Sequence, residues 1–290
     1  MNPPEGRPFP VGRRGLLLLL ALPLAAASVW ALDLSLAQLW PHAGGRRLAL
    51  EFFQAAVQPA FDYQHPVPSG TPAFLSRLGQ AIYRTVLFAA AAMSVALVAG
   101  FFLGLLASQS WWRTSGHALG RRRGWGKVWR GICFAAVRLL IALLRSIHEL
   151  LWAVIFLAAF GLHPATAILA IALPYTGTLA KIFSEMLDEA PTGSAAALQA
   201  LGAPPAWVFG FGLLPRALPD MAAYAFYRFE CAIRSAAVMG FFGIPTLGMY
   251  LKASFDNLHF REVWTYLYAL FLVVVLLEVW SWKLRRALVA

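Results

Sequence analysis

The chain has 290 residues, of which 60% are hydrophobic and only 13% are charged, with a formal net charge of +11 and a mean hydropathy of +0.66. A soluble domain of this length cannot bury that much apolar surface, so the composition predicts an all-α polytopic membrane protein, because helices satisfy their own backbone hydrogen bonds in lipid. Most cations flank apolar runs, which argues against a nucleic-acid partner. Cys133 and Cys231 lie in apolar context and leave no disulfide framework and no metal-type spacing.

Residues 1–80 are expected to form an N-terminal transmembrane helix and an external linker. The apolar run Gly15–Leu32 follows two arginines and resembles a signal peptide. Its length and the lack of a small-x-small cleavage site favour a retained helix. In the linker, the stretch RRLALEFFQAAVQ predicts either an amphipathic helix on the membrane surface or a short helix packed on the spans, because apolar side chains recur at helical spacing: Leu48, Phe52, Phe53 and Val57.

Residues 81–283 are expected to contain five further spans, which makes about six in all. The apolar runs place these spans at roughly 81–108, 132–162, 164–183, 217–242 and 262–282. The loop at 109–131 holds six Arg and Lys and no acidic residue. Its GRRRGWGK stretch lacks the glycine spacing and the hydroxyl of a phosphate-binding loop. Because no hydrolytic motif is found either, uphill transport would need an ion gradient or a separate ATPase subunit.

The cations also predict the orientation of the chain. With the N-terminus inside, 14 of the 24 Lys and Arg fall in inner segments and six in outer segments. This bias satisfies the positive-inside rule. Both termini are therefore expected to be cytoplasmic, and so is the loop at 184–215.

That loop is unusually broken for so apolar a chain. Residues Ser194–Ala203 read as a short helix of strong helix formers, ended by Gly202 and the pair Pro204-Pro205. The stretch AWVFGFGLLP then leads back towards the membrane, where Pro215 and a second proline bracket the next span. A short helix that crosses two spans on the cytoplasmic side can dock in the groove of a partner and transmit its movement.

The segment resembles the cytoplasmic coupling loop of ABC importer permeases, with the pattern E-A-A-x-x-x-G-x9-I-x-L-P. Gly202 takes the glycine position, Gly212 stands at the isoleucine position, and the glutamate is missing because Ala196 occupies its place. The resemblance assigns contact with the ATPase to this loop, through Ala196, Ala197, Leu198, Leu201, Gly202, Ala203, Leu214 and Pro215.

The fifth span makes the resemblance more specific. YRFECAIRSAAVMGFFG (Tyr227–Gly243) is similar to the R-F-E-x-x-x-R-S-A-x-x-x-G segment of phosphonate-type permeases, and LLRSIHELL is similar to their third-span R-x-x-x-E-L segment. The resemblance covers roughly residues 80–282. The chain departs from the family's glycine-rich run after Gly243, where it reads GIPTLG. The family residues that match, as candidates for the translocation pathway or gate, are Arg145, Glu149, Arg228, Glu230, Arg234, Ser235, Gly240 and Gly243.

Charged side chains within spans are costly, at about 2.5–3.5 kcal/mol for a central Arg, so they usually face a cavity or a partner. Glu230 and Arg234 are spaced i, i+4 with the acid first, which favours a helical ion pair. The alternative is that Arg234 faces the pathway and attracts an oxyanion. Arg145 and Glu149 have the same spacing with the base first, and a structural pair is favoured there too.

The resemblance implies the membrane-spanning subunit of a binding-protein-dependent importer in a bacterial inner membrane. It implies a homodimer, two P-loop ATPase subunits that bind ATP and magnesium, no cofactor in this chain, and an external binding protein. The implied cargo is phosphonate or a related oxyanion such as phosphite or phosphate. The alternatives are an ion-gradient-driven secondary transporter, for which GFFGIPTLG is a candidate helix break, and a non-transporting membrane scaffold.

Overall fold

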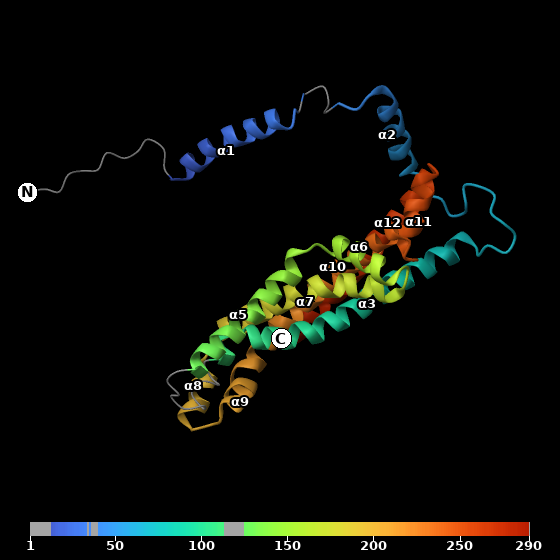
Figure 1. Ribbon diagram of the computed structural model, residues 1–290. Helices are drawn as coiled ribbons and strands as arrows, with labels where there is room; N and C mark the ends of the chain where they lie inside the picture. Colours follow the sequence, from blue (N-terminus) through green and yellow to red (C-terminus); the bar gives the residue numbers. More distant parts are fainter. Residues whose placement is uncertain (1–12, 34, 36–39, 113–124, 290) are drawn as a thin grey trace, which may run out of the picture. The chain divides into compact units, whose positions relative to one another are not determined.

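The computed structural model describes residues 13–33, 35, 40–112 and 125–289, and all regular structure in these ranges is helical (Figure 1). Most of the basic loop predicted at 109–131 lies outside the described residues. The chain divides into two compact units, Met1–Gln54 and Ala55–Ala290. The first unit holds α1 (Arg13–Ala31) and nearly all of α2 (Ala43–Ala55), so both helices expected near the N-terminus are present.

The second unit contains the remaining helices. These are α3 (Phe74–Ala107), α5 (Trp125–Ser146), α6 (Glu149–Phe160), α7 (Pro164–Glu189), α8 (Gly193–Ala200), α9 (Pro205–Trp207), the π-helix η1 (Val208–Leu213), α10 (Leu214–Val238), the 3₁₀-helix η2 (Met239–Phe242), α11 (Leu247–Asp256) and α12 (Phe260–Val289). Of the described helices, α3, α7 and α12 are each long and apolar enough to cross a membrane, and two bent pairs bring the number of spans to as many as five. The all-α membrane architecture is thus confirmed.

α7 forms the centre of the core, and glycines let its neighbours approach closely. A Cβ added at Gly100 of α3 would lie 2.8 Å from the Cβ of Leu179, and one added at Gly177 of α7 would lie 2.9 Å from the Cβ of Leu144 in α5. Small residues at these crossings allow the close packing on which helix association in a membrane depends.

The predicted third span is not one helix. α5 ends at Ser146, α6 begins at Glu149, and the two meet at 89°. His148 accepts a hydrogen bond from the backbone N–H of Leu150 and so caps α6. The span predicted at 132–162 is therefore a bent pair of helices.

The fifth span also ends in a sharp turn. α10 and η2 are followed after four residues by α11, bent by 48°, which the sequence did not predict as a separate helix. The turn needs Gly243, with φ +89°, and a close approach at Gly240, where an added Cβ would lie 2.1 Å from the backbone nitrogen of Met249. In the GIPTLG departure, Thr246 is buried and donates from Oγ1 to the carbonyl of Ala237.

The segment at 56–65 docks on the start of α12. The Ala60 N–H donates to the carbonyl of Arg261 at 3.1 Å, and Thr265 Oγ1 donates back to the carbonyl of Ala60 at 2.7 Å. Tyr268 reaches the carbonyl of Ala56 at 2.9 Å. This docked segment and α11 lie at one end of the core, whereas α8 and α9 lie at the opposite end (Figure 1).

Candidate functional site

The broken loop folds into a hairpin, Gly193–Leu213, which we call the coupling hairpin. The helix ends one residue before Leu201, and Gly202 follows with φ +78°. The N–H of Ala203 bonds the carbonyl of Leu198, and that of Gly202 bonds the carbonyl of Gln199, at 3.0 Å each. These two bonds are the Schellman motif, which needs a left-handed residue such as glycine at this position. The predicted stop at Gly202 is confirmed.

Gly212 joins the two arms of the hairpin. Ser194 Oγ donates to its carbonyl at 2.9 Å. A Cβ added at Gly212 would lie 2.9 Å from the Cα of Ala195, so an isoleucine, which the family pattern prefers here, would not fit this packing. The departure from the pattern therefore has a local structural reason.

The hairpin presents an apolar surface at its end of the core. Leu201 is 83% exposed and Trp207 and Phe211 are 61% and 69% exposed. Of the other residues assigned to the ATPase contact, Ala196, Ala197, Gly202 and Pro215 are exposed, whereas Leu198, Ala203 and Leu214 are half-buried. The sequence reasoning missed Trp207 and Phe211, whose rings lie 5.6 Å apart.

Four of the polar residues in the spans come together in a second site, the polar cluster, in which Tyr175 and Ser235 are buried and Glu149 and Arg228 are half-buried. Ser235 Oγ donates to Glu149 Oε1 at 2.8 Å, so the Tyr175 hydroxyl, 3.1 Å away, is the donor to Ser235. The guanidinium of Arg228 lies 4.5 Å from the centre of the Tyr175 ring, within cation–π range. α6, α7 and α10 each contribute to the cluster.

Arg228 keeps donor capacity in this cluster. Among the described residues, its buried Nε has no hydrogen-bond partner. A buried unpaired donor of a charged group is costly, so this nitrogen marks Arg228 as an incompletely satisfied member of the cluster. Tyr175 was not predicted, because nothing in its own stretch of α7 indicates a polar contact 60 residues further along.

The predicted pair of Glu230 and Arg234 is present. Arg234 Nη2 lies 3.1 Å from Glu230 Oε1 and also donates to Cys231 Sγ at 3.4 Å. The Arg234 side chain remains 53% exposed in the single chain. Arg234 therefore forms the predicted ion pair with Glu230 and still has an exposed side chain on α10.

Arg145 and Glu149 do not pair, although their spacing predicted it. The helix breaks between them, so i, i+4 geometry does not exist, and no ion pair among the described residues joins them. Glu149 lies instead 3.5 Å from His148 Nε2 and accepts from Ser235. Arg145 lines a cavity of about 430 Å³ with Arg138 and Lys181.

Known transport permeases are similar in sequence to about half of this chain. A putative phosphite transport system permease protein, HtxE, of Stutzerimonas stutzeri is 33% identical over 156 residues, 54% of this chain and 60% of that protein. The phosphite transport system permease protein PtxC of the same organism is 32% identical over 53% of this chain and 56% of that protein. The chain thus spans little more than half the length of these relatives. A putative cryptic phosphonate transport system permease protein, PhnE2, of Escherichia coli K12 is 30% identical over 41% of this chain and 97% of that protein.

Solved structures share the fold. An inward-facing MetNI methionine ABC transporter matches with a TM-score of 0.61 at 21% identity, over 74% of this chain and 97% of that chain. An amino acid ABC transporter matches with a TM-score of 0.59 at 14% identity, over 75% and 99%. The family model described as binding-protein-dependent transport system inner membrane component matches residues 124–281, more than half of the sequence, and includes both the coupling hairpin and all four residues of the polar cluster. The chain therefore belongs to this family of ABC importer permeases.

Proposed function

We propose that this chain is the transmembrane subunit of an ATP-driven importer that receives its cargo from an external binding protein. The observation that carries the proposal is the coupling hairpin, an apolar, exposed surface on a hydrogen-bonded turn within the matched region. Two P-loop ATPase subunits bind this surface and supply the ATP and magnesium chemistry. A second copy of the chain completes the pathway, and both termini lie in the cytoplasm of a bacterial cell whose inner membrane holds the protein.

The proposed cargo is a small phosphorus oxyanion, such as phosphite, phosphonate or phosphate. The relatives named for phosphite and phosphonate transport support this class, and so do two arginines of α10, Arg228 and Arg234. Within the described ranges the Nε of Arg228 has no hydrogen-bond partner, and Arg234 adds a second guanidinium about 1.7 turns further along the helix. Both groups suit the oxygen atoms of an anion in transit.

Docking of the ATPase is tested with Leu201→Asp. This side chain is 83% exposed, so the permease should still fold, but a charge at the centre of the apolar surface should abolish co-purification of the ATPase subunit of the same system. Val57→Asp is the matched control, because Val57 is 84% exposed in the docked segment. If Leu201→Asp retains the ATPase as well as the control does, the hairpin is not the docking surface.

The cargo is tested by growth. A bacterial strain that lacks its own phosphite and phosphonate importers should grow on one of these compounds as sole phosphorus source when the complete system is expressed. Growth should disappear with Leu201→Asp. Failure to grow on phosphite, phosphonate or limiting phosphate would contradict the cargo class without touching the ATPase assignment.

A further inference from the structure

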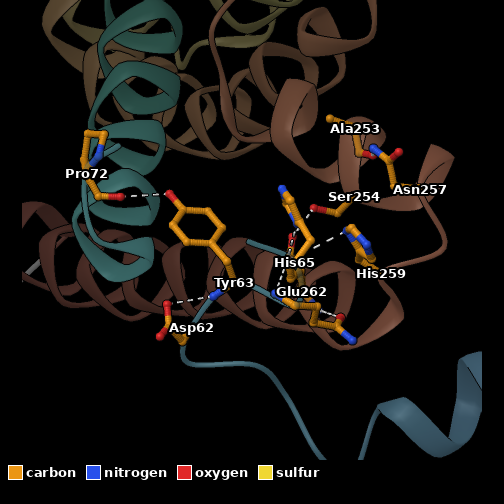
Figure 2. Close-up of polar contacts among 10 residues, drawn as sticks. Asp62, Tyr63, His65, Pro72, Ala253, Ser254, Asn257, His259 and Glu262 are labelled. Atoms are coloured by element: carbon orange, nitrogen blue, oxygen red, sulfur yellow. Dashed lines mark hydrogen bonds and ion pairs between the residues drawn. The ribbon is translucent and has the colours of Figure 1, made fainter. Parts of the chain in front are cut away.

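A histidine-rich cluster lies at the end of the core away from the coupling hairpin. It consists of His65 in the docked segment, His259 between α11 and α12, and Glu262 in the first turn of α12, and we call it the histidine cluster (Figure 2). The Nδ1 atoms of His65 and His259 lie 3.9 Å and 4.0 Å from Glu262 Oε1. The function proposed above uses none of these residues.

Glu262 is buried and lacks a permanent cationic partner. Its side chain is 3% exposed. Of the described residues, only the two histidines lie within ion-pair distance of its carboxylate. A buried carboxylate is costly unless it is paired or coordinates a metal, so the pocket around Glu262 favours a cation.

The carboxylate is held in place but not saturated. Oε1 accepts from the backbone N–H of Gln64 at 2.7 Å, and Oε2 accepts from Ser254 Oγ at 2.7 Å. The N–H of Glu262 donates to Gln64 Oε1 at 3.1 Å. An ionised carboxylate has about four lone-pair sites, so it retains acceptor capacity for a metal. The contacts already present act as the outer shell that orients a ligand.

The spacing of the three ligand atoms is close to that of a metal site. All three lie within 4.8 Å of one another. In a tetrahedral zinc site with bonds of about 2.0–2.2 Å, neighbouring ligand atoms lie about 3.4 Å apart. We propose that His65, His259 and Glu262 bind a divalent transition-metal ion of the zinc class, with remaining positions open to water.

Binding requires one local movement. The two imidazole rings are stacked, with centroids 4.8 Å apart and planes inclined by 13°. A metal lies in the plane of each imidazole that binds it, so at least one ring must turn. His65 is the ring that can do so, because its side chain is 46% exposed whereas that of His259 is 24% exposed.

The site would fasten the docked segment to the start of α12. Two ligands come from the α11–α12 region and the third comes from a segment nearly 200 residues earlier. Two nitrogen ligands and one carboxylate match the preference of zinc, nickel and copper rather than calcium or magnesium, which take oxygen ligands. The ion would therefore act as a clamp for the segment that leads into α3.

The test uses the full chain, purified in detergent with an affinity tag that contains no histidine and stripped with a chelator. Zn²⁺ binding is measured by calorimetry, and Co²⁺ is added as a spectroscopic probe of coordination. Wild type should bind Zn²⁺ and should give the visible absorption of a four-coordinate Co²⁺ site. His65→Ala and Glu262→Gln should each weaken Zn²⁺ binding by about 10- to 100-fold or more, since even outer-shell changes have effects of that size.

His42→Ala is the matched control, because it removes an exposed histidine from the other unit and leaves the cluster intact; it should bind as wild type does. Zn²⁺ should also slow hydrogen exchange at residues 56–65 in wild type and in the control, but not in His65→Ala. Absence of Zn²⁺ binding in wild type, or equal affinity in wild type and His65→Ala, would overturn the proposal. Either result would leave the importer assignment intact, because that assignment rests on the opposite end of the core.

Discussion

Single residues in the spans have one of two roles, and their contacts distinguish them. Gly240 and Gly243 serve the backbone turn, since one allows a close approach and the other has a positive φ. The buried Nε of Arg228 has no hydrogen-bond partner in the part of the chain that the structure describes. Arg234 has its ion-pair partner but remains half exposed. The two glycines therefore shape the turn, their predicted place at the gate stays a prediction, and the two arginines are the proposed contacts with cargo.

Arg234→Ala separates these roles. A partly exposed i, i+4 ion pair stabilises by at most about 1 kcal/mol, so the variant should fold and retain its ATPase partner. If Arg234 attracts the anion, uptake of labelled cargo should fall by at least tenfold. Lys252→Ala is the control, because it removes a comparable pair with Asp256 at 2.5 Å. Uptake by Arg234→Ala at the control rate would remove Arg234 from the pathway.

At the scale of elements, a turn could be predicted from the sequence where the residues that produce it lie within a few positions of it. The coupling hairpin could be predicted because Gly202 and Pro204-Pro205 break the helix within a few residues. The break between α5 and α6 has no such signal, since RSIHEL contains neither glycine nor proline. The contact that Glu149 makes beside the break is non-local, because its hydrogen-bond donor Ser235 lies 86 residues away. The stacking of the His65 ring on the His259 ring could not be predicted from the sequence either, because the two residues lie far apart in it.

Packing of α3 on α7 gives a prediction at this scale. Gly100→Ala places a Cβ 2.8 Å from the Cβ of Leu179, so overpacking should destabilise the core by about 1–3 kcal/mol. Gly131→Ala in α5 is the control, because nothing lies within 4 Å of its added Cβ and alanine is the better helix former by about 0.5–1 kcal/mol. Thermal unfolding in detergent should show a lower midpoint for Gly100→Ala only. Equal unfolding midpoints for the two variants would mean that α3 can move away from α7 without a loss of stability.

At the scale of the whole second unit, one candidate contact surface, the coupling hairpin, and the docked segment lie at opposite ends of one core. The coupling hairpin stands at the end where α7 meets α10, and the docked segment stands where α11 meets α12 (Figure 1). The sequence predicted the first surface but left the role of residues 33–80 open. The structure assigns part of that stretch, because residues 56–65 are bonded to the backbone and side chains of α12.

Thr265→Val tests how independent the two ends are. The change keeps the shape of the side chain but removes the 2.7 Å hydrogen bond to the carbonyl of Ala60, which should loosen the docked segment by about 1–3 kcal/mol because a buried acceptor loses its partner. Hydrogen exchange should accelerate at Ala60 and Gln64, while the coupling hairpin and co-purification of the ATPase stay unchanged. Thr178→Val is the control, because its hydroxyl bonds only Pro174 of its own helix. Loss of the ATPase from Thr265→Val, with the control intact, would instead mean that the docked segment is mechanically linked to the hairpin through α12 and α10.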